Sequence, residues 1–369
     1  WYMKSKLFIF VFVISAFSLF GCSKTEKISY VFSDGQISVE ENNIYNKNNN
    51  GIIEVISVPE FNSAPLCSLP NCTHSDIECI SKRFNSVPLI CNSKAYYFIN
   101  DSVEYIVENN ITDIKLGTTL YEYDFTSNKE RKIKHIDGVV FSENGYIINN
   151  NILYFIGNHL GRQYDESGNL ISNRNSGGKQ QLFSVNLENY DIINLGDMYN
   201  PDELTAVYPL AENSAEVYIK GVFDNKIFFD TAFAVEENEI VKFKLYSSYY
   251  DLSSEKFEVI SNLNNIIFSE INYISKDYLA LSCENELKIY HKTYDTPIVI
   301  EDEIISVGHH SKCYIDDDLV IYNGYIFDWN SCNKKESEQL KDKKIIMKYE
   351  NNFITLMKNE FDIIPWNIN

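Results

Sequence analysis

Three cysteines and one histidine lie within thirteen residues of the sequence, in the segment from Cys67 to Cys79. Their spacing is C-x4-C-x-H-x4-C, with Cys72 and His74 as the two middle members. Three thiolates and one imidazole are a donor set that tetrahedral structural zinc uses, and sulfur ligands favour zinc over calcium or magnesium. Pro70 and the short gaps predict a loop that folds back on itself. The segment is therefore a candidate site for one structural zinc ion.

A disulfide-bonded loop is the alternative for this segment, formed among Cys67, Cys72, Cys79 and the next cysteine along the chain, Cys91. Disulfides persist outside the cytoplasm, which is where the N-terminal residues direct the chain, as argued below. Apart from Cys22, seven of the eight cysteines remain, and an odd number cannot all pair within one chain. The spacing leaves zinc and disulfide both open. In either case we expect a structural role, in which the zinc ion or the disulfide stabilises the N-terminal part of the fold.

The rest of the sequence carries weaker signals for catalytic or metal-binding residues. The sequence contains no G-x-S-x-G, H-E-x-x-H, P-loop or dinucleotide-binding glycine pattern. His309 and His310 are adjacent, and adjacent side chains of a strand point to opposite faces, so this pair is not suited to share a metal. We therefore predict no catalytic residue, and the sequence does not indicate a binding site.

The N-terminal residues have the pattern of an export signal. Lys4 and Lys6 precede an apolar run over residues 7–20, which is shorter than the roughly 20 residues of a membrane-spanning helix. The run ends in Leu-Phe-Gly-Cys, which resembles the lipobox of bacterial lipoproteins. Residues 1–22 are thus predicted to be a lipoprotein signal peptide with Cys22 as the lipidated residue. The basic region directly follows Met3, where we expect translation to start.

Composition limits the classes of partner and of fold. The chain has 32 Lys and Arg against 52 Asp and Glu, a net charge of −20, which repels nucleic acid and anionic lipid headgroups. We therefore expect no nucleic acid partner. A chain of 369 residues with 44% hydrophobic and 14% aromatic content is neither disordered nor a small disulfide scaffold. Abundant Tyr and Phe suit strands, and Asn suits the turns between them.

The elements that must position the cysteine segment form a repeat. A short aromatic or aliphatic strand preceded by turn residues recurs at 95–99, 152–156, 226–230, 277–281, 318–322 and 352–356. Most are followed by an alternating strand, a turn and another strand, as at 120–124 and 132–133. Such alternation indicates strands with one buried face. The array predicts an all-β protein with one β-propeller over residues 51–369, after a polar tether and first strand region at 23–50.

The number of blades depends on the two ends of this array. We expect six blades, with the strand at 51–58 pairing with the C-terminal unit at 344–366 to close the ring and remove exposed edges. If residues 28–58 build a whole blade alone, the count is seven. The alternative architecture is a β-sandwich with a small additional domain.

An export signal, a strand, a Pro-Asn-Cys-x-His cluster with flanking cysteines, and degenerate blades together resemble Gram-positive bacterial lipoproteins with TolB-like propellers. The specific part of this resemblance is the segment 67–79. The resemblance implies architecture and location, because activity in that group is largely unassigned.

We therefore expect a monomeric protein that is anchored by lipid to the outer face of a Gram-positive cell membrane. Its expected role is to bind a glycan or an envelope protein, as a binding or scaffold protein without catalysis. One alternative is an extracytoplasmic lyase or hydrolase that acts on polysaccharide or peptidoglycan. Another is a sensor or assembly module of the envelope.

Overall fold

The computed structural model describes most of the chain after residue 29. The described residues are 30–33, 37–40, 43–57, 60, 62–67, 72–75, 79–84, 86–100, 104–108, 111–115, 117–159, 163–164, 170–172, 180–199, 204, 206–260, 268–307, 312–317, 319–328, 333–341, 343–349, 352–357 and 360–365. The predicted signal peptide with Cys22 lies outside them, as do Cys332 and the pair His309 and His310. Within these ranges no helix has the length and apolar character needed to cross a membrane.

The described residues form seven antiparallel blades, which are numbered here in chain order. Blade 1 comprises β2 (Ile37–Glu40), β3 (Asn43–Lys47), β4 (Ile53–Ser57) and β5 (Asn62–Pro65). Blade 2 comprises β6 (Leu89–Cys91), β7 (Lys94–Asn100), β10 (Gly117–Asp124) and β11 (Lys129–Asp137). Blade 3 comprises β12 (Val139–Asn149), β13 (Ile152–His159), β16 (Gln180–Asn186) and β17 (Ile192–Asp197).

The second half of the chain builds the other four blades. Blade 4 comprises β18 (Glu216–Phe223), β19 (Lys226–Glu237), β20 (Ile240–Asp251) and β21 (Lys256–Val259). Blade 5 comprises β22 (Ser269–Ile274), β23 (Tyr278–Cys283), β24 (Glu286–His291) and β25 (Ile298–Glu301). Blade 6 comprises β26 (Cys313–Ile315), β27 (Leu319–Tyr322), β28 (Tyr325–Asp328) and β29 (Lys334–Glu336). Blade 7 comprises β30 (Lys344–Tyr349), β31 (Asn352–Met357) and β32 (Glu360–Pro365).

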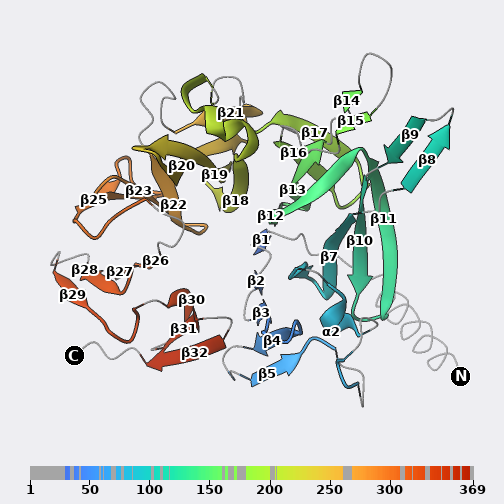
Figure 1. Cartoon of the computed structure of the whole chain (residues 1–369). Coiled ribbons are helices and arrows are strands. Elements are labelled where there is room, and N and C mark those ends of the chain that lie inside the picture. Colours follow the sequence, from blue (N-terminus) through green and yellow to red (C-terminus); the bar gives the residue numbers. More distant parts are fainter. Residues whose placement is uncertain are drawn as a thin grey trace, which may run out of the picture.

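Short elements decorate this ring. The hairpin of β8 (Glu104–Glu108) and β9 (Ile111–Lys115) extends blade 2, and β14 (Gln163–Tyr164) pairs with β15 (Leu170–Ser172) beside blade 3. The single-turn helix α2 (Ile80–Arg83) and the 3-10 helix η1 (Pro209–Asn213) lie in connections between blades. The first strands of successive blades contact one another, as β12, β18 and β22 do, so these strands line the inside of the ring (Figure 1).

Two-residue turns join the first two strands of several blades. Both turn residues have positive φ in Asn92–Ser93, Asn150–Asn151 and Asp224–Asn225, which join the first and second strands of blades 2, 3 and 4, and also in Asn238–Glu239, which joins β19 to β20. Two residues with positive φ define the hairpin turn whose twist matches that of the flanking strands, and Asn and Asp tolerate this conformation best. The Asn- and Asp-rich segments that precede the predicted strands are therefore the turns that direct each second strand back along the first.

The core is divided into layers between neighbouring blades. Leu120 of blade 2 packs with Phe155 of blade 3 in one buried cluster, which also includes Phe98 and Phe141. The ring of Phe98 stacks on Phe141 with 4.4 Å between centroids. Similar clusters join blade 3 to blade 4, blade 4 to blade 5, blade 5 to blade 6 and blade 6 to blade 7. Each blade is therefore held mainly by its two neighbours in the ring.

The structure confirms the all-β propeller and does not form the β-sandwich, but it has seven blades and closes differently from our first expectation. The strand expected at 51–58 is β4, which pairs with β3 and β5 inside blade 1. In the described part of the chain, blade 7 contains only its own three strands. The expected pairing of N- and C-terminal strands is therefore wrong. Residues 37–65 complete a four-stranded sheet alone, because the Asn48–Gly51 turn folds β4 back on β3.

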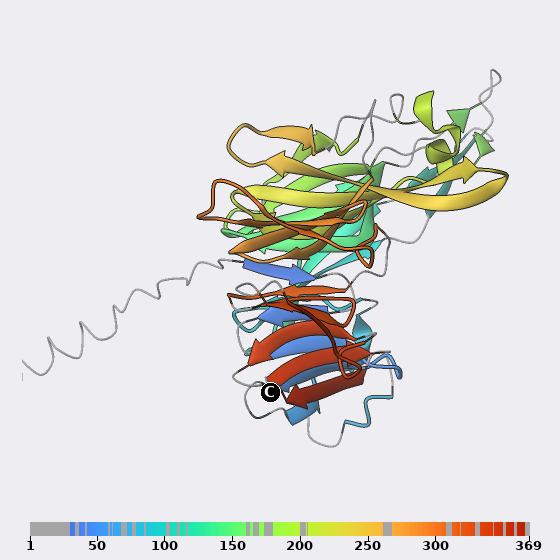
Figure 2. The ribbon, with the colours of Figure 1, turned by 90° about the vertical axis from the view of Figure 1, so that its left-hand side faces the viewer.

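The ring closes by side-chain packing. Ile354 of β31 is 1% exposed and packs with Ile37, Ile44 and Ile56 of blade 1, and Figure 2 shows these two blades side by side. A second connection comes from β1 (Tyr30–Ser33), which pairs with β2 of blade 1 and with β12 of blade 3. Strands β1 to β3 lie in the region 23–50, where the tether and first strands were expected, and they are part of the ring.

Candidate metal centre

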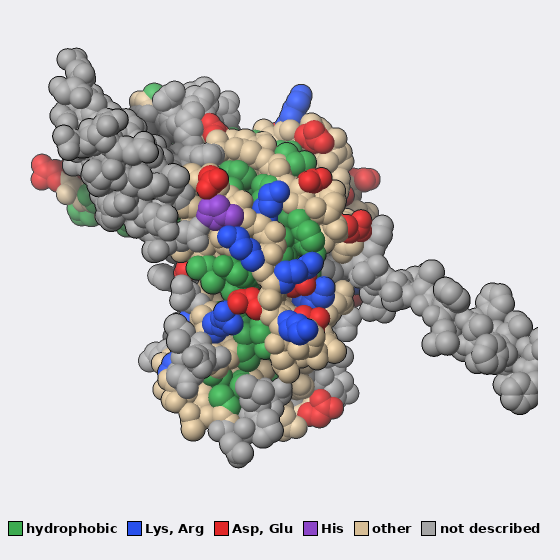
Figure 3. Space-filling model, turned by 90° about the vertical axis from the view of Figure 1, so that its right-hand side faces the viewer, with side chains coloured by type: hydrophobic (Ala, Val, Ile, Leu, Met, Phe, Trp, Pro, Cys, Tyr) green, Lys and Arg blue, Asp and Glu red, His purple; other side chains and the backbone are tan. Residues whose placement is uncertain are grey.

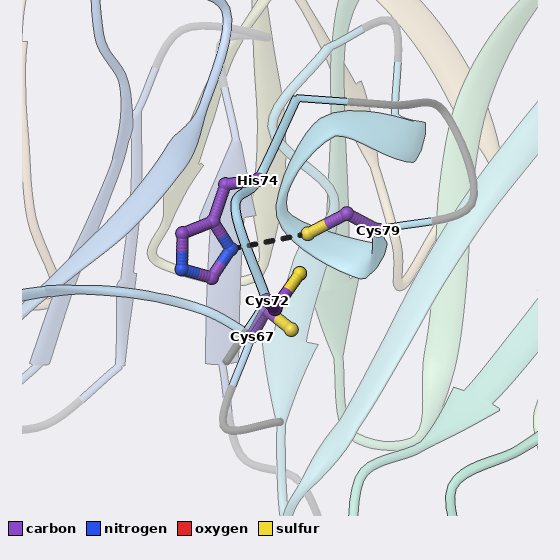
Figure 4. Close-up of side chains that lie close together, drawn as sticks. All are labelled: Cys67, Cys72, His74 and Cys79. Atoms are coloured by element: carbon purple, nitrogen blue, oxygen red, sulfur yellow. Dashed lines mark hydrogen bonds between the residues drawn. The ribbon is translucent and has the colours of Figure 1, made fainter. Parts of the chain in front are cut away.

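The connection between blades 1 and 2 carries the cysteine and histidine residues singled out in the sequence. It leaves β5 at Pro65 and reaches β6 at Leu89, and α2 lies within it. Cys67, Cys72, His74 and Cys79 of this connection lie close together, and the His74 ring faces the sulfur of Cys79 (Figure 4). The sequence prediction that these four side chains form one group is confirmed.

The spacing of the donor atoms fits one metal ion. The three sulfur atoms and the histidine nitrogen all lie within 4.8 Å of one another. Nδ1 of His74 is 3.3 Å from Sγ of Cys79. In tetrahedral zinc with Zn–S near 2.3 Å and Zn–N near 2.0 Å, ligand atoms are about 3.5–3.8 Å apart. The group is therefore close to coordination geometry and needs only small inward shifts to enclose an ion.

Packing places half of this group in the core. Cys67 and Cys79 are buried, whereas Cys72 and His74 are half-buried. The cysteines pack in the cluster between blades 1 and 2 that contains Phe84 and Tyr97, whose rings meet edge to face at 4.6 Å. The sulfurs of Cys67 and Cys79 are thus screened by apolar side chains, while Cys72 and His74 are partly exposed to solvent.

Backbone contacts hold the two ends of the connection together. The N–H of Cys67 donates to Oγ of Ser81, a fully buried side chain in α2, over 2.5 Å. The N–H of Lys82 donates to the carbonyl of Cys79, which starts the helical turn. His74 has φ of 53°, a left-handed conformation that non-glycine residues adopt at a cost. In this conformation the imidazole of His74 lies against the sulfur of Cys79, so the backbone of the loop is compatible with the grouping of the four side chains.

The centre is also tied to blade 2 through charged and phenolic groups. Arg83 at the end of α2 donates to Oε2 of Glu130 on β11 over 2.6 Å, and the hydroxyl of Tyr97 donates to the other oxygen of Glu130. Burial raises the pKa of Tyr123, and the nearby Cys67 sulfur raises it further. Sequence analysis did not find this link. Its only signal was an arginine four residues after Cys79.

The other cysteines that the structure describes, Cys91, Cys283 and Cys313, do not join the group. Cys91 is buried in the cluster between blades 2 and 3, whereas Cys67 and Cys79 belong to the cluster between blades 1 and 2. Cys283 and Cys313 lie on β23 and β26, in blades 5 and 6. The described donor set is therefore three sulfurs and one nitrogen.

Comparisons with known proteins report similarity of fold. No family model matches the sequence, and no curated protein matches it. The chain is similar to the β-propeller domain of the Trilobed protease from Pyrococcus furiosus, at 11% identity and a TM-score of 0.39 over 93% of this chain and 95% of that chain. It is also similar to TolB from Acinetobacter baumannii, at 8% identity and a TM-score of 0.27 over 83% of this chain and 79% of that one.

A third similar structure is an acylaminoacyl peptidase in complex with Z-Gly-Gly-Phe-chloromethyl ketone, at 11% identity and a TM-score of 0.37. The alignment covers 75% of this chain and 44% of that peptidase, so the chain spans less than half of its length. The assignment of this chain as a propeller stands on its own sheet order and blade packing.

Proposed function

We propose that this chain is a lipid-anchored extracytoplasmic binding protein whose propeller is stabilised by one structural zinc ion. The observation that carries the zinc part of the proposal is the Cys67, Cys72, His74 and Cys79 group, with all four donor atoms within 4.8 Å. Four protein ligands fill the tetrahedral coordination of zinc and leave no position for a water or substrate. Such a centre stabilises structure and does not activate water.

The position of the centre supports a stabilising role. It lies in the connection between blades 1 and 2, and among the described residues of that connection the regular element is the four-residue helix α2. Metal coordination in a short irregular segment supplies free energy of folding that the segment cannot obtain from its own backbone. The zinc would therefore fix α2 against blade 2 and fix the end of blade 1 that leads into it.

The buried acid Asp230 is engaged by its neighbours within the fold. Burial raises the pKa of its carboxyl group. It is enclosed between blades 4 and 5, where Ser247 and the Ile271 backbone donate to it and Lys220 lies 3.3 Å away. A carboxylate so completely engaged is a structural group, because general acid–base catalysis requires access to a substrate.

The anchor and location rest on the N-terminal pattern. Lipidation of Cys22 would hold the chain at the outer face of the cell membrane of a Gram-positive bacterium. There the propeller would act as a monomeric binding or scaffold protein for a glycan or an envelope protein. Loops on a rigid scaffold are a common position for binding residues, which is why a ring of seven blades suits this role.

Fractionation of cells tests the anchor. We expect the full-length chain in the membrane fraction, accessible to protease added to intact protoplasts, and we expect Cys22→Ala to lose membrane attachment. Cys283→Ser is the matched control, because that cysteine lies within blade 5. Membrane association that survives in Cys22→Ala would contradict lipidation at this residue.

Limited proteolysis tests the stabilising centre. We expect Cys72→Ser to make the connection between blades 1 and 2 sensitive to protease, with cleavage between residues 66 and 88, while Cys283→Ser stays resistant. Equal resistance of both variants would show that the centre does not hold this connection.

A further inference from the structure

One outer strand of the ring differs from all the others in charge. The outermost strand of each blade is β5, β11, β17, β21, β25, β29 or β32. Of these, β11 is the longest, with nine residues, and its sequence KERKIKHID holds four Lys and Arg and one His. The others are between three and six residues long, and none has more than two basic residues. Within a chain of net charge −20, this strand is an exception.

Neighbouring elements enlarge the basic area. Lys82 and Arg83 at the end of α2 and Lys94 at the start of β7 belong to the same blade and connection. Figure 3 looks at the side of the ring where β11 lies and shows Lys and Arg side chains gathered over its centre. We call this area the basic patch. Its members are Lys82, Arg83, Lys94, Lys129, Arg131, Lys132 and Lys134.

The acids within the patch neutralise only part of it. Glu122 pairs with Lys94 and with Arg131 at 3.3 and 3.1 Å, and Glu130 pairs with Arg83. Lys129, Lys132 and Lys134 are exposed, and no ion pair involves any of the three within the described ranges. The patch therefore presents three exposed lysines that form no ion pair in that part of the chain.

The paired residues hold the strand that carries these lysines in a fixed position. Arg131 forms hydrogen bonds to Glu122 and to the hydroxyl of Tyr190, and its guanidinium lies 4.9 Å from the centre of the Tyr190 ring. Glu122 is 6% exposed, so this network is anchored below the surface. A ligand that contacts the lysines would meet an ordered strand and would lose little free energy to ordering it.

The three lysines lie on both faces of the outermost strand. Lys129 and Lys132 are three residues apart, and a register shift separates Lys132 from Lys134, so neighbouring members of the set point to opposite faces of β11. The patch therefore offers positive charge along the edge of blade 2 and on both sides of that edge. At physiological ionic strength, charges beyond about 8 Å are screened, so the acidic remainder of the chain does not cancel the patch for a ligand lying on it. The matching ligand is an extended polymer with repeated negative groups that can lie along this edge.

We propose that the basic patch binds an acidic polysaccharide, a sugar chain that carries repeated carboxylate or sulfate groups. This inference rests on the proposed binding function and names its ligand class and its surface. A polysaccharide with one carboxylate per sugar ring carries fewer charges per unit length than duplex DNA, which carries one per about 1.7 Å and is wide enough to meet the acidic surface beyond the patch on this chain of net charge −20. The lower charge density favours the polysaccharide.

Lysines on an edge strand also prevent sheets from pairing edge to edge. That role concerns the edge strand alone, whereas the patch also includes three basic residues on α2 and β7. The test must nevertheless separate the two roles.

Binding is measured with the full-length chain in detergent micelles, with polygalacturonate and heparin as the carboxylate and sulfate probes and dextran as the neutral one. The variant is Lys129→Gln/Lys132→Gln/Lys134→Gln. The matched control is Lys256→Gln/Lys276→Gln/Lys335→Gln, which removes three exposed lysines from blades 4, 5 and 6 and gives the same net charge. We expect the patch variant to bind the acidic probes at least about tenfold more weakly, and the control to stay within about twofold of the unmodified chain.

The salt dependence supplies a second readout. We expect the slope of log K against log salt concentration to fall by roughly two to three in the patch variant, about one for each lost contact. The inference would be overturned if the patch variant and the control variant bound the acidic probes with equal affinity. It would also be overturned if the unmodified chain bound dextran as tightly as the acidic probes, or bound single-stranded DNA more tightly than both of them. If the patch variant self-associates and its affinity for the acidic probes is unchanged, the inference is also overturned. The lysines would then serve to prevent edge-to-edge pairing of β11.

Failure of this inference differs from failure of the proposed function. If no acidic polysaccharide binds but the chain binds a neutral envelope glycan, the basic patch is excluded and the binding function stands. If the chain stays in the cytoplasm in the fractionation experiment, the proposed function itself fails.

Discussion

Arg83 and Glu130 join the candidate metal centre to the outermost strand of blade 2. The guanidinium of Arg83, four residues after Cys79, lies 2.6 Å from Oε2 of Glu130 on β11. The same carboxylate accepts from Tyr97, whose ring packs on Phe84 just after α2. The connection that holds the centre and the strand that holds the basic patch are therefore mechanically coupled.

A double-mutant cycle measures this coupling. With Arg83→Met and Glu130→Gln we expect a coupling free energy of about 0.5 kcal/mol, because both side chains are partly exposed and solvent screens the pair. Chemical unfolding gives the four free energies. We expect a chelator to reduce the coupling toward zero, because α2 then loses its fixed position. A coupling that is the same with and without chelator would show that α2 does not depend on the metal.

Asp230 controls part of the pH dependence of stability. Its pKa is raised in the folded chain by burial, so the folded state binds a proton more tightly than the unfolded state does. The contribution of this group is therefore fully present below its unfolded pKa, near 4, and is lost as pH rises through the higher folded pKa. We expect the difference in free energy of unfolding between the unmodified chain and Asp230→Asn to fall over that range.

The same residue also has a direct effect on stability. Asp230→Ala leaves the Ile271 N–H and the Lys220 ammonium without their buried acceptor, and we expect a loss of about 3 kcal/mol or more at neutral pH. Asp251→Ala is the control, since that carboxylate is exposed in a turn and accepts from Ser253 and Ser254. A loss for Asp230→Ala no larger than that for Asp251→Ala would show that the link between blades 4 and 5 is weak.

Ile354 tests how the ring closes. Because it is buried against Ile37, Ile44 and Ile56, Ile354→Ala should leave a cavity between blades 7 and 1 and destabilise the fold by about 2–4 kcal/mol. Hydrogen exchange should increase first in these two blades. Ile193→Ala is the control, because that side chain is 58% exposed. Faster exchange spread evenly over all seven blades would argue against closure at this contact.

Much of the fold could be predicted from local pattern. The strands expected at 95–99 and 226–230 are parts of β7 and β19, because aromatic runs after Asn and Asp turns form hairpins wherever they occur. The grouping of Cys67, Cys72, His74 and Cys79 was also predictable, since short spacing limits how far apart the four can be. Both cases depend on residues that are near one another in the sequence.

Closure was harder to predict because it depends on residues far apart in the chain. Nothing in the sequence around Ile354 indicates that it packs on Ile44 without a shared sheet, since packing between blades leaves no periodic signal of its own. The Asn48–Gly51 turn was a local signal for a complete first blade and would have favoured seven. The links from Arg83 to Glu130 and from Asp230 to Ile271 join different elements, and only the folded chain shows them.

The central claim is that Cys67, Cys72, His74 and Cys79 hold one structural zinc ion, and metal content tests it most directly. Native mass spectrometry and elemental analysis of the full-length chain, purified without chelator, should give one zinc per chain. Cys72→Ser should lose the metal, and Cys283→Ser should keep it. Cobalt substitution should give the absorption bands of a tetrahedral site with three sulfur ligands. A chain that binds no metal under these conditions, or a Cys72→Ser variant with a full zinc content, would contradict the account.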